Sequence, residues 1–86
     1  NPFNDNLNVS FTSSSESKYI IEVTDMTGRK VMINEGKAYE GDNTIELDAR
    51  NLASGIYLLT LQNGSEEKQT TMVMKWGVFY SAVRFL

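Results

Sequence analysis

The side chains best suited to acid–base chemistry in this sequence are a few dispersed carboxylates. The chain has no histidine and no cysteine, which excludes Ser-His-Asp triads, cysteine nucleophiles and Cys/His zinc sites. A carboxylate pair could hydrolyse a glycosidic bond, but each acidic candidate falls at a turn or on the solvent side of a predicted strand. These candidates are Asp5, Asp25, Asp42, Glu46 and Asp48. We therefore expect no catalytic residue and no enzyme activity.

Two short segments carry oxygen ligands that calcium could use. They are Asn4-Asp5-Asn6 and Gly41-Asp42-Asn43. Neither has the ligand spacing or the terminal glutamate of a calcium-binding loop. The sequence therefore predicts no metal site and no cofactor.

Aromatic residues could stack on a sugar ring, as they do in carbohydrate-binding modules. Phe11, Tyr19 and Tyr57 occupy alternating positions of predicted strands, where aromatic side chains more often fill the core. Trp76 and Tyr80 lie outside those strands. An accessory carbohydrate-binding or adhesive β-sandwich module of a secreted enzyme nevertheless stays open as the alternative function.

Length and composition indicate one folded domain. The 86 residues are 41% hydrophobic and 22% charged, which argues against disorder. The net charge of −3 and the scattered lysines and arginines argue against nucleic acid as a partner. No apolar run is long enough to span a bilayer, and the first residues do not form a signal peptide. We expect the chain to begin inside a longer precursor.

Alternating apolar and polar residues predict six short strands and no helix. The only proline is at position 2. This pattern favours an all-β fold, a small antiparallel β-sandwich of the Ig-like or fibronectin-like kind with about six to seven strands. The predicted strands cover residues 7–12, 19–24, 31–33, 44–48, 56–61 and 69–74, with a loop at 36–42.

Turn residues predict how some of these strands are joined. In the segment 25–29, Gly28 should supply a positive φ and make strands 19–24 and 31–33 an antiparallel hairpin. Asn63-Gly64 indicates a type I′ turn, in which both residues have positive φ. The unbroken apolar run 56–61 favours a central strand covered on both faces.

Four segments together resemble the C-terminal sorting domain of the type IX, or Por, secretion system, in its type A-like form. They are Asn1-Pro2-Phe3, residues 25–31, residues 52–57 and Met72-Val73-Met74-Lys75. The resemblance covers residues 1–75 and implies a β-sandwich at the C-terminus of Bacteroidetes cargo proteins. The implied partners are the type IX translocon, a sortase-like peptidase that cuts upstream of Asn1, and the cargo domain. The implied destination is the cell surface or the medium, reached through the periplasm and outer membrane.

The resemblance also assigns roles to particular residues. Translocon recognition is expected at Val73, Met74 and Lys75. We expect Lys75 to have no packing role, and it could instead discourage edge-to-edge pairing. The motif residues with expected structural roles are Pro2, Gly28, Arg29, Gly55, Tyr57 and Gly64; for Gly28 and Gly55 turn geometry is the expected reason, and for Tyr57 core packing.

Residues 76–86 depart from the family, whose members usually end near the position of Lys75. We therefore expect a sorting domain at 1–75 followed by an apolar tail, residues 76–86. An apolar tail would be costly to expose, so it should add a strand or cover a sheet edge, in this molecule or in a neighbour. In the neighbour it would cause self-association; a non-native extension is the other interpretation.

Overall fold

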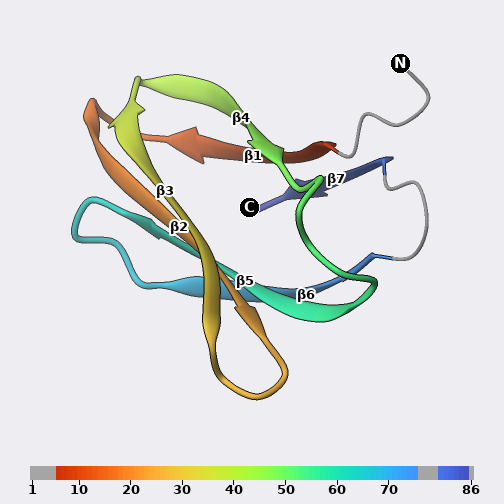
Figure 1. Cartoon of the computed structure of the whole chain (residues 1–86). Coiled ribbons are helices and arrows are strands. Elements are labelled where there is room, and N and C mark those ends of the chain that lie inside the picture. Colours follow the sequence, from red (N-terminus) through yellow and green to blue (C-terminus); the bar gives the residue numbers. More distant parts are fainter. Residues whose placement is uncertain (1–5, 76–79, 86) are drawn as a thin grey trace.

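Seven strands make up the fold in the computed structural model, which describes residues 6–75 and 80–85. In Figure 1 they run from red to blue along the chain. Their bounds are β1 Asn6–Ser13, β2 Ser17–Asp25, β3 Lys30–Ala38, β4 Gly41–Asp48, β5 Gly55–Asn63, β6 Gln69–Lys75 and β7 Tyr80–Arg84. The predicted all-β fold is confirmed, and within these residues no helix could cross a bilayer.

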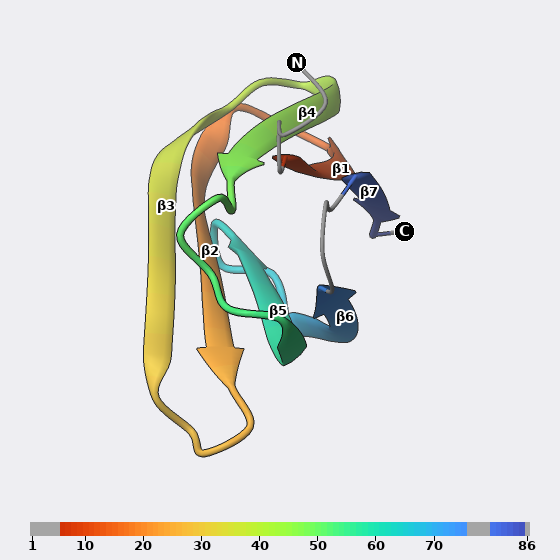
Figure 2. The ribbon, with the colours of Figure 1, turned by 45° about the vertical axis from the view of Figure 1, so that its right-hand side comes forward.

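The strands form two sheets that face each other. One has the order β4-β1-β7 and the other β3-β2-β5-β6, and Figure 2 shows the two layers with the chain crossing between them. All pairings are antiparallel except that of β7, which runs parallel to β1. The predicted hairpin of β2 and β3 is confirmed. The architecture is therefore a β-sandwich.

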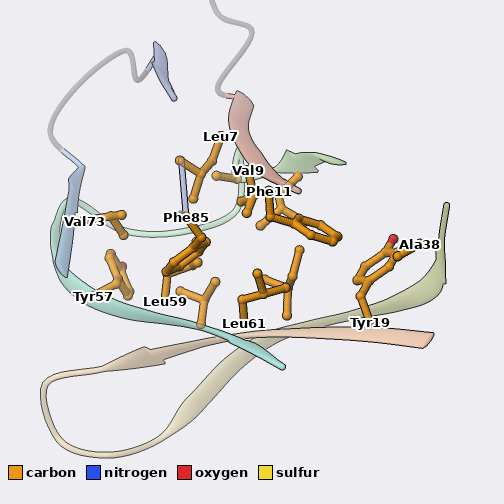
Figure 3. Packing of buried hydrophobic residues seen from close by; sticks show 14 residues of the cluster. Leu7, Val9, Phe11, Tyr19, Ala38, Tyr57, Leu59, Leu61, Val73 and Phe85 are labelled. Carbon is orange, nitrogen blue, oxygen red and sulfur yellow. The ribbon is translucent and has the colours of Figure 1, made fainter. Parts of the chain in front are cut away.

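A single apolar layer fills the space between the sheets (Figure 3). Alternation along each strand turns every second side chain inward, so both sheets contribute to one core. The layer also includes Phe85, just after β7, whose backbone N–H donates to the Ser10 carbonyl at 2.8 Å. Its buried members are Leu7, Val9, Phe11, Tyr19, Ile21, Val23, Ala38, Leu47, Ala49, Tyr57, Leu59, Leu61, Val73 and Phe85.

Buried hydrogen bonds connect the two sheets at both ends of the sandwich. At one end the Asn63 side chain of β5 donates to Ser13 Oγ of β1 at 3.0 Å, and it accepts from Ser17 Oγ at 2.6 Å. At the other end Lys75 Nζ of β6 donates to the carbonyl of Ala49, just after β4, at 2.6 Å. Because buried polar groups need partners, these bonds favour one alignment of the sheets.

The predicted loop at 36–42 is wrong. Strand β3 continues to Ala38 and β4 begins at Gly41, so two residues connect them. Gly36 lies opposite Tyr19 in the sheet, and a Cβ at position 36 would lie only 2.7 Å from Tyr19 Oη. Here the glycine lies within a strand and makes room for an aromatic ring. From the sequence alone, such a glycine cannot be distinguished from one in a loop.

The expectation that 56–61 is covered on both faces is also wrong. β5 is a central strand, between β2 and β6, but its side chains alternate between buried and exposed. Ile56 and Leu58 face outward and are exposed, whereas Tyr57, Leu59 and Leu61 are buried. The cause is that a two-layer sandwich covers only the inner face of each sheet.

The expected type I′ turn at Asn63-Gly64 does not form. Gly64 has a φ of 58°, but no described non-glycine residue has positive φ. Asn63 remains in β5, and residues 64–68 form a longer connection to β6. The Asn63 side chain bonds Ser13 and Ser17, and these hydrogen bonds favour the strand conformation of residue 63.

The two faces of β5 should respond differently to truncation. Leu59→Ala removes a fully buried side chain and should lower the free energy of unfolding by about 3 kcal/mol. Leu58→Ala, one residue away on the outer face, should cost about 1 kcal/mol or less. Urea denaturation followed by tryptophan fluorescence would measure both. Equal losses would contradict the assignment of the faces.

Candidate functional site

The residues expected to be recognised lie at the end of β6, and the structure separates them by exposure. Met74 points outward and is 47% exposed, whereas Val73 belongs to the core and Lys75 is only 5% exposed. Adjacent strand residues face opposite sides of a sheet, which accounts for this difference. Of the three, Met74 is the one that offers a side chain to a partner in the folded protein.

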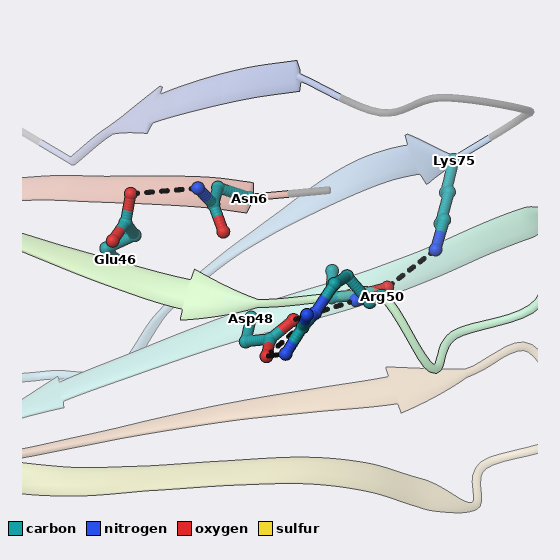
Figure 4. A network of polar contacts seen from close by, with 6 residues as sticks. Asn6, Glu46, Asp48, Arg50 and Lys75 are labelled. Carbon is teal, nitrogen blue, oxygen red and sulfur yellow. Dashed lines mark hydrogen bonds and ion pairs between the residues drawn. The ribbon is translucent and has the colours of Figure 1, made fainter. Parts of the chain in front are cut away.

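The expectation that Lys75 has no packing role is wrong. Its side chain runs inward from β6 to the segment after β4, where Nζ donates to the Ala49 carbonyl at 2.6 Å (Figure 4). That carbonyl also accepts from the Leu52 N–H at 3.1 Å. The lysine therefore fastens the end of one sheet to the loop that leaves the other.

This loop is ordered by charged neighbours. Arg50 forms a bidentate pair with Asp48, with Nε to Oδ1 at 2.9 Å and one terminal nitrogen, Nη2, to Oδ2 at 2.7 Å (Figure 4). Hydrogen bonds from Arg50 hold the pKa of Asp48 below its usual value, and the charge of Lys75 contributes less. The segment that receives the Lys75 amine thus begins beside an exposed ion pair between Asp48 and Arg50.

The segment 25–31 forms a hairpin at the same end of the sandwich. Gly28 has a φ of 91°, as predicted, and its N–H donates to the Asp25 carbonyl at 3.0 Å. Asp25 Oδ1 accepts from the Thr27 and Arg29 backbone N–H groups and from the Thr27 hydroxyl. Arg29 is exposed and pairs with Asp25 Oδ2 at 3.3 Å.

The segment 52–57 completes this end of the molecule. The Tyr57 ring is buried and its hydroxyl donates to the Ala53 carbonyl, which agrees with the expected packing role. Gly55 does not have positive φ, and a Cβ there would only touch the Tyr57 ring at 4.0 Å. The turn-geometry explanation for Gly55 is therefore wrong, because the backbone at this position suits other residues.

These segments, far apart in sequence, are neighbours in space. Asp25 lies opposite Tyr57, Tyr57 opposite Val73, and Gly55 opposite Lys75 in adjacent strands. A groove at this end is lined by residues of both the hairpin and the 48–57 segment, among them Asp25, Arg29, Asp48, Leu52 and Tyr57. Pro2, at the start of the first segment, lies outside the described residues.

The other candidate chemistries find no support in the described residues. No group of three acidic side chains there could hold a metal. Asp42 accepts from Thr12 and Arg84, and Glu46 accepts from Asn6 (Figure 4). The Asn43 amide bonds the Tyr39 backbone. Asp5 and the Trp76 ring lie outside the described residues, and nothing is described of the Tyr80 side chain.

Sequence reasoning missed four exposed apolar side chains on the outer face of β5 and β6. They form the outer apolar patch, which consists of Ile56, Leu58, Met72 and Met74. Ile56 lies directly opposite Met74, and Leu58 opposite Met72. Alternation along the Met72–Lys75 segment could have revealed the outward methionines, but the run 56–61 concealed the outward positions of β5.

Comparison with known families identifies what the chain is similar to. The family model for the secretion system C-terminal sorting domain matches residues 1–75. No curated protein and no solved structure shows significant similarity to the chain. The match covers β1 to β6 and all the segments that meet at the Lys75 end.

Loss of the Lys75 amine should weaken the fold. Lys75→Met keeps most of the side-chain volume but removes the bond to Ala49, and it should lower the free energy of unfolding by about 1–2 kcal/mol. The matched control is Lys68→Met, which replaces an exposed lysine and should change stability little. If urea midpoints of the two variants are the same, Lys75 does not fasten the sheets.

The hairpin carboxylate should make stability depend on pH. The pKa of Asp25 is lowered from 3.8, first by the Thr27 hydroxyl bond and then by the backbone N–H groups and Arg29. A group with a lowered folded-state pKa stabilises the fold above its unfolded pKa and loses that contribution as pH falls through the folded value. The stability advantage of the wild type over Asp25→Asn should therefore be full near pH 6 and shrink below pH 3.8. A constant difference from pH 6 down to about pH 2 would contradict this.

Proposed function

The chain belongs to the family of secretion system C-terminal sorting domains, and we propose that its folded sandwich, rather than a linear segment, is what the type IX machinery recognises. The domain is a C-terminal sorting signal of type IX secretion, so it directs export by way of the outer membrane to the cell surface or the medium. Domains of this family are not catalytic.

The observation that carries the proposal is the meeting of the family segments at one end of the fold. The hairpin, the start of β5 and the end of β6 become neighbours only when the sheets form. Along the chain, 20 residues separate segment 25–31 from segment 52–57, and 14 separate the latter from segment 72–75, so an unfolded chain presents no common surface of the three. The arrangement therefore supports recognition of a folded end.

Within this end the residues have different roles. Met74 and Arg29 are exposed and are the side chains that we assign to contact with the machinery. Val73 and Lys75 are buried and act by positioning: one packs in the core, and the other holds β6 against the Ala49 loop. Lys75 therefore contributes to recognition indirectly, because its amine holds β6 in position.

Residues 80–85 are assigned here to the same folded unit as residues 6–75. Phe85 packs in the core and β7 pairs with β1, and both support this assignment. Removal of this segment would unpair one edge of β1 and take Phe85 out of the core. Tests of sorting should therefore use residues 1–86.

The signal also implies processing of the exported protein. We assign to a sortase-like peptidase a cut upstream of Asn1 that separates the cargo from this domain. Most described residues lie in extended, hydrogen-bonded strands, and the connections between the strands are short, whereas protease cleavage favours exposed, poorly bonded chain. A cut before the sandwich, rather than within it, follows from that difference.

The alternative, an accessory carbohydrate-binding or adhesive module, is less well supported. Stacking on a sugar needs exposed aromatic rings, but Phe11, Tyr19 and Tyr57 are buried. The exposed Tyr39 lies beside the Lys37 amine, 5.5 Å from its ring centre. No observation on the described residues favours this second function.

A reporter would test the sorting function. A fluorescent protein with a Sec signal at its front and residues 1–86 at its back should reach the surface or medium in type IX-competent cells and stay in the periplasm in deficient cells. Met74→Glu should reduce export several-fold without unfolding the domain, because it places a charge at the proposed contact.

The control for this variant is Ile33→Glu, which changes a 50% exposed apolar residue of β3 away from the Lys75 end. Its export should match the wild type. Periplasmic retention of the folded wild-type fusion in competent cells would rule out the sorting function. Equal export of both variants would instead refute only the role of Met74.

A further inference from the structure

One sheet edge in this molecule lacks the features that normally prevent strands from pairing between molecules. β6 ends the order β3-β2-β5-β6, and of the described strands only β5 pairs with it. Its other side therefore presents a row of backbone N–H and C=O groups. The strand is seven residues long, without proline and without an irregularity in its pairing to β5.

Two other edges of the described sheets, β3 and β4, are protected. β3 has a register shift against β2 near Thr24, and it carries Lys30 and Glu35, paired with Glu22 and Lys18 on β2 at 3.0 and 3.1 Å. β4 carries Asp42, Glu46 and Asp48. Charged side chains and bulges are common means of preventing edge-to-edge pairing, and β6 has neither in an effective position.

Lys75 does not protect the β6 edge, although it is the single ionisable residue of the strand. Its amine is turned inward to the Ala49 carbonyl and is 5% exposed. The charge that could repel another strand is thus held inside the sandwich. The bond that fastens the two sheets also leaves the edge uncharged.

The outer apolar patch lies along this same edge. Met72 is 60% exposed and Met74 47%, and Leu58 and Ile56 lie opposite them on β5. Outward positions farther along the two strands, Thr60 and Thr70, are uncharged and share a hydroxyl hydrogen bond at 3.1 Å. An occupant must therefore be an extended, uncharged strand with apolar side chains on alternate positions.

The molecule itself contains a strand with that chemistry, which is β6. We propose that β6 pairs antiparallel with β6 of a second copy, joining two four-stranded sheets into one continuous sheet. The register that matches all seven residues places Met72 against Met72 of the partner copy on a two-fold axis and Thr70 against Met74. The methionines of both copies then cover one another on the outer face.

The contact is small, so the association is weak, with a Kd on the order of 100 μM. It does not rest on the proposed function, because the argument uses only the edge and its side chains. It also does not use residues 76–86, whose strand β7 pairs with β1 of its own chain.

Sedimentation equilibrium of residues 1–86 from about 10 μM to about 1 mM tests the association. The mass should rise from 9.7 kDa toward twice that value. Met72→Lys should weaken association at least tenfold, because two like charges would face each other across the axis. Ile33→Lys makes the same apolar-to-lysine change at an exposed residue of β3, and it should leave the association unchanged.

Cross-linking tests the register even if a lysine variant fails to fold. The chain has no cysteine, so Met72→Cys introduces a unique thiol. Oxidation should then yield a disulfide-linked dimer, because directly opposed Cβ atoms are about 5 Å apart. Met74→Cys should not cross-link, since the two thiols would be about 13 Å apart along the strands.

A wild-type chain that stays monomeric to about 1 mM would overturn the proposal. So would a dimer that tolerates Met72→Lys and gives no Met72→Cys cross-link. If the chain is monomeric and the folded Met72→Lys variant loses type IX export while Ile33→Lys keeps it, the surface belongs to a strand of the export machinery. That result would also overturn self-association, but it would leave the sorting function standing.

Discussion

The structure depends on two sheets sharing one apolar layer, because no backbone ladder joins the sheets within residues 6–75 and 80–85 and the chain has no cysteine. Fourteen buried apolar side chains of the described part of the chain supply attraction, but apolar contact is non-directional and does not fix how the sheets align. Two buried hydrogen bonds favour one alignment of the sheets: Asn63 with Ser13 at one end, and Lys75 with the Ala49 carbonyl at the other. Both contacts need inward polar groups at strand ends, where the apolar layer stops.

This constraint connects the fold to its function. Backbone pairing places the end of β6 beside the start of β5, and β5 beside β2 of the hairpin, while the Lys75 contact ties this end of the sheet to the loop after β4. The same contact hides the lysine charge and leaves β6 with an uncharged edge and outward methionines. The proposed recognition at this end and the proposed pairing of β6 therefore both depend on how this one side chain is turned.

Much of the fold could be predicted from local patterns, and the errors occurred where a distant residue decided the outcome. Alternation located the strands, and Gly28 correctly marked the first hairpin because its φ is set within the turn itself. Gly36 predicts a loop in the sequence, but the actual requirement for glycine is the Tyr19 ring on the neighbouring strand. The roles of the Asn63 and Lys75 side chains could not be predicted locally, because their partners, Ser13 and Ala49, lie 50 and 26 residues away. The exposed face of β5 could not be seen in a continuous apolar run, since it follows from how many layers the fold has.

The central claim is that the export machinery recognises the folded sandwich. It is tested most directly by measuring, for a graded series of core substitutions such as Ile21→Val, Leu47→Ala and Val9→Ala, both the fraction folded at the growth temperature and type IX-dependent export of the same fusion. Export that falls in proportion to the folded fraction is the result that the account predicts. Undiminished type IX-dependent export of a variant that is unfolded under those conditions would contradict it, and would mean that a linear segment carries the signal.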